Sequence, residues 1–301
     1  MALMVGTGPF GRSPAGVFNF EVDAPKHQLY LERSPRRIRA VIGGEVVADS
    51  TGAYLLHETG LLPVYYLPRT DVRDELLEPS DTSTHCPFKG DASYWHVRVG
   101  DEVREDAIWA YPEPLAGAPP LADLVAFAWD TVDEWYEEAE RIGVHPRDPY
   151  HRCDVVRTDR HVVVRVDGEV IAESHRARLL FETGLPPRTY LPAEDVDQAR
   201  LEPSDTVTRC PYKGTTSRYH SIRVGDHLVE DAIWVYDDPH DEVRGIAGLL
   251  AFDDDKVDIE STPARWQRPE PLGSSVKPPE QRHLTPAVRG TRTAPPARTH
   301  R

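Results

Sequence analysis

Two segments of the chain combine cysteine, lysine and glycine in the same order. Residues 84–90 read Thr-x-Cys-Pro-Phe-Lys-Gly, and residues 208–214 read Thr-x-Cys-Pro-Tyr-Lys-Gly. A thiol becomes a nucleophile when a nearby cation lowers its pKa, so Cys86 with Lys89 and Cys210 with Lys213 are candidate catalytic pairs. The alternative interpretation is structural, because cysteine is often buried and Lys89 could pair with Glu78 or Asp81 to brace a loop.

Two glutamates and six aromatic residues complete the candidate sites. Glu58 and Glu182 each follow a pair of leucines, so we expect a carboxylate with catalytic potential beside buried surface, where desolvation would raise its pKa. Alternatively, each glutamate accepts backbone N–H bonds at the end of a strand. The aromatic residues could form the ligand-binding wall of a small-molecule pocket in each copy, or they could pack in the core. They are Tyr66, Trp109, Tyr111, Tyr190, Trp234 and Tyr236.

A third repeated block, Leu-Glu-Pro-Ser-Asp-Thr, occupies residues 77–82 and 201–206. Its proline fixes φ for a turn, and Asp81 or Asp205 can accept a hydrogen bond from the backbone two residues on. We therefore expect a turn brace here, with acid or base catalysis as the alternative.

All these blocks belong to one long duplication. Residues 33–96 match residues 157–220 at 33 of 64 positions without a gap. After a one-residue insertion, Glu-Asp-Ala-Ile-Trp at 105–109 returns at 230–234. A period near 124 residues is too long for a solenoid unit and long enough for each copy to hold its own core. The sequence thus predicts a duplicated domain with a site in each copy.

The ordered motifs resemble one protein family. Glu-Thr-Gly, Tyr-x-Pro, Leu-Glu-Pro-Ser-Asp, Cys-Pro-aromatic-Lys-Gly and Trp-x-Tyr follow one another as in domain of unknown function number 427, also labelled nucleotidyltransferase family 9. The resemblance covers about residues 29–137 and 152–260, and the chain resembles the two-copy form found in actinobacteria. It implies a mainly β domain similar to the β-tent fold of methionine sulfoxide reductase B and the Rab-associated zinc proteins. It implies no established function.

Hairpin signals support a mainly β fold. Alternating apolar residues run into Gly43-Gly44 and into Asp167-Gly168, which suit the positive φ angles of tight turns. Further hairpins are expected around Gly100 and Gly225. Helical spacing of apolar residues predicts a helix over residues 121–142, although its first half could be a strand because residues 248–253 in the copy are β-like.

These patterns divide the chain into five parts. We expect a loose leader over residues 1–28, repeat domains over 29–142 and 152–262, a Pro-punctuated linker over 143–151, and a disordered tail over 263–301. The tail is basic and holds eight prolines with almost no large apolar residue, so it cannot offset its ordering entropy.

Composition excludes several classes of protein. The formal charge is −15, and the basic tail leaves −21 on residues 1–262, which argues against a nucleic-acid partner. No segment reaches the apolar length of a membrane span, and the first residues lack the pattern of a secretion signal. Three widely spaced cysteines give no disulfide framework, so a cytoplasmic location is expected.

Metal and nucleotide chemistry are not expected from motifs. The chain has no Cys-x-x-Cys knuckle and no compact His-x-x-x-His spacing, so we predict no metal and no other cofactor. The nucleotidyltransferase label calls for a Gly-Ser turn followed by paired acids. Gly273-Ser274 lies in the tail, and Asp253-Asp254-Asp255 has no equivalent in the first copy.

The favoured hypothesis is an unknown small molecule bound in a pocket of each repeat, with Cys, Lys and Glu available for chemistry. A non-catalytic binding or interaction module whose copies act together is the alternative, and nucleotidyl transfer is the weaker one. Because the copies differ in their aromatic residues but keep Cys and Lys, the sequence leaves catalysis and oligomeric state open.

Overall fold

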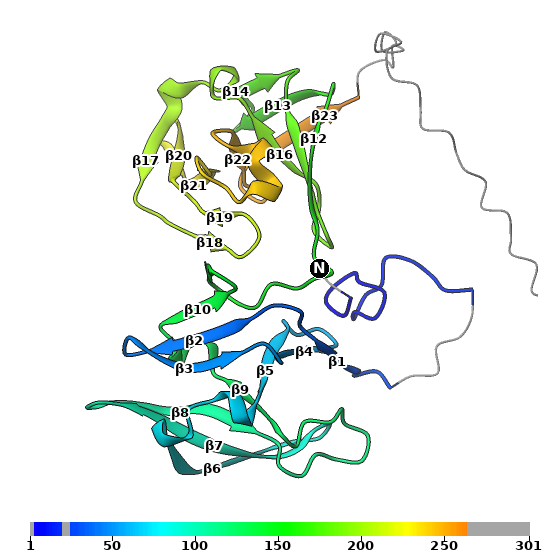
Figure 1. Ribbon diagram of the computed structural model, residues 1–301. Helices are drawn as coiled ribbons and strands as arrows, with labels where there is room; N and C mark the ends of the chain where they lie inside the picture. Colours follow the sequence, from blue (N-terminus) through cyan, green and yellow to red (C-terminus); the bar gives the residue numbers. More distant parts are fainter. Residues whose placement is uncertain (1–2, 20–24, 264–301) are drawn as a thin grey trace, which may run out of the picture. The chain divides into compact units, whose positions relative to one another are not determined.

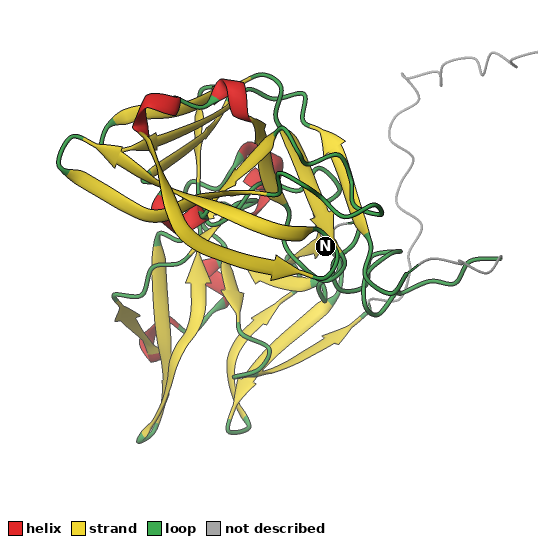
Figure 2. Cartoon of the chain, turned by 90° about the horizontal axis from the view of Figure 1, so that it is seen from below, coloured by secondary structure: helices red, strands yellow, loops and turns green. Residues whose placement is uncertain are grey.

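The protein is described here by a computed structural model, which covers residues 3–19 and 25–263 (Figure 1). The expected tail therefore lies outside the described residues from position 264 onward. Within the described ranges the chain is mainly β, as predicted, and Figure 2 shows strands joined by loops and short helical turns. These turns are 3-10 helices: η1 (Arg69–Asp71), η2 (Asp74–Leu76), η3 (Trp129–Thr131), η4 (Ala193–Asp195), η5 (Gln198–Arg200) and η6 (Asp241–Ile246).

The first repeat contains two antiparallel sheets. The large sheet has the strand order β1-β4-β5-β9-β8-β7-β6, and the small sheet has the order β11-β10-β2-β3. The strands are β1 (Leu29–Arg33), β2 (Ile38–Ile42), β3 (Glu45–Ser50), β4 (Tyr54–Glu58), β5 (Val64–Pro68), β6 (Leu77–Cys86), β7 (Gly90–Val99), β8 (Glu102–Ala110), β9 (Leu124–Phe127), β10 (Glu134–Glu137) and β11 (Glu140–Ile142).

The second repeat has the same topology. Its large sheet runs β12-β15-β16-β22-β21-β20-β17, strand for strand the order of the first, and a smaller sheet runs β14-β13-β23. The strands are β12 (Cys153–Arg157), β13 (His161–Val166), β14 (Glu169–Ser174), β15 (Arg178–Glu182), β16 (Arg188–Leu191), β17 (Leu201–Ser204), β18 (Arg209–Cys210), β19 (Gly214–Thr215), β20 (Arg218–Val224), β21 (His227–Val235), β22 (Leu250–Phe252) and β23 (Asp258–Thr262). The prediction of two tandem domains of one fold is confirmed.

The predicted hairpins are present. β2 and β3 pair across Gly43-Gly44, with φ of 58° and 78°, and β13 and β14 pair across Asp167-Gly168, with φ of 51° and 80°. A two-residue turn with positive φ at both central positions matches the twist of the paired strands. β7 with β8 and β20 with β21 form the second hairpin of each repeat, at Gly100 and Gly225.

The helix predicted over residues 121–142 is wrong, and the alternative of a strand in its first half is confirmed by β9. β9 lies in the middle of the large sheet with all four residues buried, so its continuous apolar run reflects a strand covered on both faces. β10 pairs with β2 and buries Trp135 in the core between the sheets. Pairing with strands distant in sequence overrides the local helical spacing, as it does wherever tertiary contacts compete with a weak local preference.

Each large sheet buries both of its faces. In the first repeat one face packs with the small sheet around Ile38, Leu67 and Trp135. The opposite face carries a second apolar cluster around Leu56, Tyr66 and Tyr111. The second repeat repeats the division, with a further cluster around Leu180, Tyr190 and Tyr236. Successive side chains of a strand point to opposite faces of the sheet. The second face therefore carries every other side chain of several strands.

The segment expected as a loose leader contacts the first repeat. Gly60 N donates to Met4 O at 2.8 Å, Thr59 Oγ1 donates to Phe10 O at 3.4 Å, and the Met4 side chain is buried. Met4 and Phe10 therefore contact the Glu-Thr-Gly turn that follows β4, whereas residues 12–19 are exposed.

No helix in the described part of the chain is long and apolar enough to cross a membrane.

Substituting Gly168 tests the hairpin turn. Gly168→Ala adds a Cβ to a residue with φ of 80°. No neighbouring atom lies within 4 Å of that Cβ, so backbone strain is the only cost of the substitution. We expect a loss of about 1–2 kcal/mol of unfolding free energy in urea denaturation. Gly143→Ala, also in open space but without a positive φ, is the control and should change stability by less than about 1 kcal/mol. Equal effects at the two positions would contradict the turn geometry.

Candidate functional site

Several predicted site residues lie on the second face of the large sheet. Tyr66 of β5 and Trp109 of β8 both pair with Ala126 of β9, so two aromatic side chains flank one small residue. The second repeat places Tyr190 and Trp234 on either side of Ala251 in the same way. Half-buried Cys86 and Trp109 pack against the cluster that contains Tyr66 and Tyr111. The register of the sheet thus brings residues from distant parts of the sequence together.

A buried ion pair anchors each site. Lys89 Nζ donates to Glu58 Oε1 at 2.5 Å, and Lys213 Nζ donates to Glu182 Oε2 at 2.5 Å. Only 6% of Glu58 and 8% of Lys89 is exposed. The structural interpretation of Lys89 is therefore supported, but with Glu58 as its partner. Glu78, the partner suggested by sequence, is bonded to Arg98 instead.

The electrostatics of the second site differ from the expectation for a buried carboxylate. Burial acts to raise the pKa of Glu182, but the hydrogen bond from His151 and the charge of Lys213 outweigh it and lower this pKa to about 2. Burial acts to lower the pKa of Lys213, whereas Cys210 and Glu182 act to raise it, and the net direction is upward. The predicted upward shift of the Glu182 pKa is wrong, because its partners favour the charged form.

A histidine missed by the sequence analysis completes each site. His27 Nε2 lies 3.2 Å from Glu58 Oε2, and His151 Nε2 lies 3.0 Å from Glu182 Oε1. The rings stack on the aromatic residue of the turn, with ring centroids 4.1 Å apart for His27 and Phe88 and 3.7 Å apart for His151 and Tyr212. The two histidines are separated by the repeat offset of 124, which was the available signal.

The Cys-Pro-aromatic-Lys-Gly turn is fixed through its backbone. Lys89 N donates to Cys86 O at 3.3 Å, and Leu115 N donates to Lys89 O at 3.0 Å. In the second repeat His240 N donates to Lys213 O at 3.1 Å. Gly90 has φ of 105°, and a Cβ there would lie 3.2 Å from Glu113 O. Glycine is thus required where the chain must turn sharply beside another backbone segment.

The tyrosines are buried, whereas the tryptophans are half-buried. Tyr66, Tyr111, Tyr190 and Tyr236 all lie in apolar clusters. Trp109 Nε1 donates to Tyr66 OH at 3.4 Å, and Lys89 Nζ lies 5.5 Å from the centre of the Tyr111 ring. Burial raises the pKa of Tyr190 to about 12. These aromatic residues support the Lys–Glu pair from the sheet side.

The three cysteines are all half-buried. Cys86 contributes to the raised pKa of Tyr111, after burial, and so lies beside that ring. The lysine of each turn donates to glutamate, so its ammonium group has a carboxylate partner as well as the nearby thiol. In the second repeat Cys153 Sγ lies 3.7 Å from His151 Nε2, and burial followed by Glu182 raises the Cys153 pKa to about 12.

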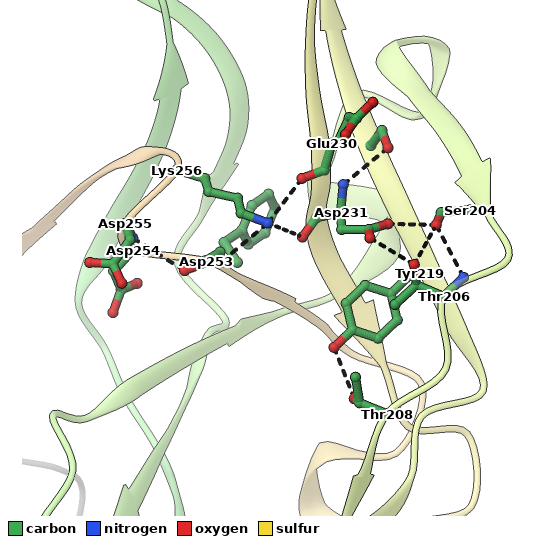
Figure 3. Close-up of polar contacts among 12 residues, drawn as sticks. Ser204, Thr206, Thr208, Tyr219, Glu230, Asp231, Asp253, Asp254, Asp255 and Lys256 are labelled. Carbon is green, nitrogen blue, oxygen red and sulfur yellow. Dashed lines mark hydrogen bonds and ion pairs between the residues drawn. The ribbon is translucent and has the colours of Figure 1, made fainter.

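The Leu-Glu-Pro-Ser-Asp-Thr block forms a brace with a second repeated block. Ser204 Oγ and Thr206 Oγ1 donate to the two carboxylate oxygens of Asp231, at 2.5 and 2.7 Å (Figure 3). Ser80, Thr82 and Asp106 repeat these contacts at 2.5 and 2.7 Å. Asp106 and Asp231 have φ of 48° and 51°, at bulges where strand pairing shifts register. A turn brace was expected, but the block begins in strands β6 and β17. The acceptor of the brace is this aspartate, while Asp81 and Asp205 are exposed.

The acidic run at residues 253–255 is held by neighbouring cations. Lys256 Nζ donates to the carbonyls of Glu230 and Asp231, and lies 3.6 Å from Asp253 Oδ2 (Figure 3). Arg188 Nη1 lies 3.1 Å from Asp254 Oδ2. The run therefore acts as a local charged turn.

Equivalent pockets lie over the turn in both repeats. Their volumes are about 500 Å³ in the first repeat and about 240 Å³ in the second. Both are lined by the turn and by the segment that enters the first strand. The shared positions are Pro25 and Pro149, His27 and His151, Gln28 and Arg152, Leu29 and Cys153, Pro87 and Pro211, and Phe88 and Tyr212.

A family model described as a domain of unknown function (DUF427) matches residues 30–138 and again residues 154–262. The chain belongs to this family. It carries two copies of the DUF427 domain, as the resemblance implied. Among curated proteins, no sequence matches the chain. In each DUF427 copy the matched range contains the Glu–Lys pair, while His27, Leu29, His151 and Cys153 precede it.

Breaking one ion pair tests its contribution to stability. Lys89→Met leaves the buried Glu58 carboxylate without its ammonium partner, so we expect a loss of about 3–5 kcal/mol of unfolding free energy. Arg98→Met, which breaks the exposed pair with Glu78, is the control and should cost about 1 kcal/mol or less. The double variant Glu58→Gln/Lys89→Met should recover part of the loss. Urea denaturation of all four proteins measures this, and equal costs for the two single variants would refute the assignment.

The lowered pKa of Glu182 predicts a pH dependence. A carboxylate whose folded pKa is depressed contributes stability above its unfolded value, near 4.5, and loses it as the pH falls toward about 2. The urea midpoint of the wild type should therefore decline more steeply between pH 4.5 and pH 2 than that of Glu182→Gln. Parallel declines would show that Glu182 is not stabilised in its charged form.

Proposed function

We propose that each DUF427 domain binds a small metabolite in the pocket over its Cys-Pro-aromatic-Lys-Gly turn. The observation that supports this is the recurrence of the pocket at six equivalent positions in both repeats. At this pocket both copies keep an imidazole stacked on the aromatic ring of the turn. A cytoplasmic location, inferred from the spacing of the cysteines, belongs to the same proposal.

The lining suggests what the metabolite looks like. The half-exposed aromatic residue offers a planar apolar surface, since 42% of Phe88 is accessible. The imidazole stacked on it adds a polar group tied to the buried carboxylate. Ligand pockets commonly combine apolar walls with a few such convergent polar groups. A small molecule with a flat apolar part and one hydrogen-bonding end fits this combination.

Binding is favoured over catalysis at Cys86 and Cys210. A nucleophilic thiol needs a cation or base that is free to activate it. Lys89 and Lys213 instead each donate a hydrogen bond to a glutamate oxygen at 2.5 Å. His27 and His151 contact the same carboxylates. The charged groups are thus arranged to hold one another and the turn.

A fragment screen by ligand-observed NMR on the full chain tests the proposal. Fragments with a planar ring and one polar group should bind, and Phe88→Ala together with Tyr212→Ala should abolish their signals. Each single variant should remove the signals of its own repeat only. Val207→Ala changes another exposed apolar residue outside the pocket and should leave binding intact. Hits that survive the double variant, or a screen without hits, would refute the proposal.

A further inference from the structure

Three side chains of different chemistry converge in the second repeat. His151 Nε2, Cys153 Sγ and a carboxylate oxygen of Glu182 all lie within 4.8 Å of one another. We propose that these residues bind one Zn²⁺ ion, with a fourth coordination position open to the pocket. The inference goes beyond metabolite binding and does not rest on it.

The separations between the atoms suit tetrahedral zinc. Zinc bonds of about 2.0–2.3 Å to N, O and S place neighbouring ligand atoms about 3.3–3.6 Å apart in a tetrahedron. His151 Nε2 lies 3.0 Å from Glu182 Oε1 and 3.7 Å from Cys153 Sγ. These two edges need adjustments of only a few tenths of an ångström, and the third, from Cys153 Sγ to the Glu182 oxygen, is within 4.8 Å.

The sheet register produces this arrangement. Cys153 of β12 is directly opposite Glu182 of β15, and side chains of opposed residues lie close together on one face. His151 is two residues before Cys153, and its ring is held by stacking on Tyr212 at 3.7 Å. A ligand set whose orientation is fixed by packing loses little entropy on binding.

The balance of charge favours a divalent cation despite Lys213. The Lys213 ammonium donates to Glu182 Oε2, so Oε1 is the oxygen facing His151. Thiolate and carboxylate together carry two negative charges, against one positive charge from the lysine. Zinc ligation converts the Cys153 thiol to a thiolate and releases its proton to solvent. The Lys213 bond to Oε2 then acts as the outer hydrogen bond that ligating carboxylates usually have.

The pocket beside the three ligands also has acidic side chains in its wall. Asp148 lines it beside His151 and Cys153, and only 4% of this residue is exposed. Its Oδ2 atom accepts no hydrogen bond among the described residues and lies 4.0 Å from Nδ1 of His57. Asp148 thus adds a buried carboxylate to the wall of the same pocket. Zinc fits the mixed sulfur, nitrogen and oxygen ligands better than magnesium or calcium, which prefer oxygen alone.

The first repeat is a built-in control. Its equivalent of Cys153 is Leu29, which is opposite Glu58 in the same register, while His27 and Glu58 keep their contact. A ligand set without the thiol leaves only imidazole and carboxylate. The proposal therefore requires one zinc ion per chain rather than two.

Metal titration of the full chain, after treatment with a chelator, tests the proposal. Calorimetry with zinc sulfate should give a stoichiometry of one, and Co²⁺ should show thiolate charge-transfer absorption. Cys153→Leu, which copies the first repeat, should abolish both signals, whereas Cys210→Ser should keep them. Leu29→Cys should raise the stoichiometry to two.

Two outcomes would overturn the zinc site. One is the absence of binding in the wild type, and the other is undiminished binding in Cys153→Leu. Circular dichroism of each variant should match the wild type, so that loss of the metal is not loss of the fold. Fragment binding at the first repeat, which lacks the thiol, reports on metabolite binding separately from this result.

Discussion

Each repeat depends on a lysine–glutamate pair removed from water. Burying two charges costs several kcal/mol per ion unless each is well partnered, so the pair is stable only if its surroundings hold both groups in place. The sheet fixes Glu58 at the end of β4, and the turn fixes Lys89 through hydrogen bonds on both sides of its peptide. The pair thus makes the position of the turn, and with it the wall of the pocket, a consequence of the fold.

Local sequence chemistry predicted the elements better than the contacts between them. Gly43-Gly44 and Asp167-Gly168 identified hairpins because few residues accept their φ angles. The helix predicted over residues 121–142 failed because burial on both faces of β9 imitates a helical apolar pattern. The partners of Ser80 and Lys89 are Asp106 and Glu58, more than twenty residues away, and only the tertiary fold selects them over nearer acids.

The parts of the site that sequence missed have a common cause. His27 and His151 lie outside the strongly matching segment, so the duplication did not mark them although they obey its offset. The candidate metal ligands are a His-x-Cys pair and a glutamate on the adjacent strand, which no compact motif describes. Comparing the two copies distinguishes constant from variable positions. The Glu–Lys pair is the same in both copies, whereas the pocket wall has Leu29 and Phe88 in the first and Cys153 and Tyr212 in the second. One scaffold can therefore present two different surfaces.

The placement of tryptophan gives the second repeat an optical property. Trp234 is the only tryptophan among the described residues of that repeat, and it lies across Ala251 from Tyr190, on the same sheet as Cys153 and Glu182. The Arg188 guanidinium lies 5.1 Å from its ring, so its indole experiences both a nearby cation and the buried second face of the sheet. Its emission is consequently sensitive to charge and solvent at the site. Excitation energy absorbed by Tyr190 passes to this indole, whose emission adds to that of the four tryptophans described in the first repeat.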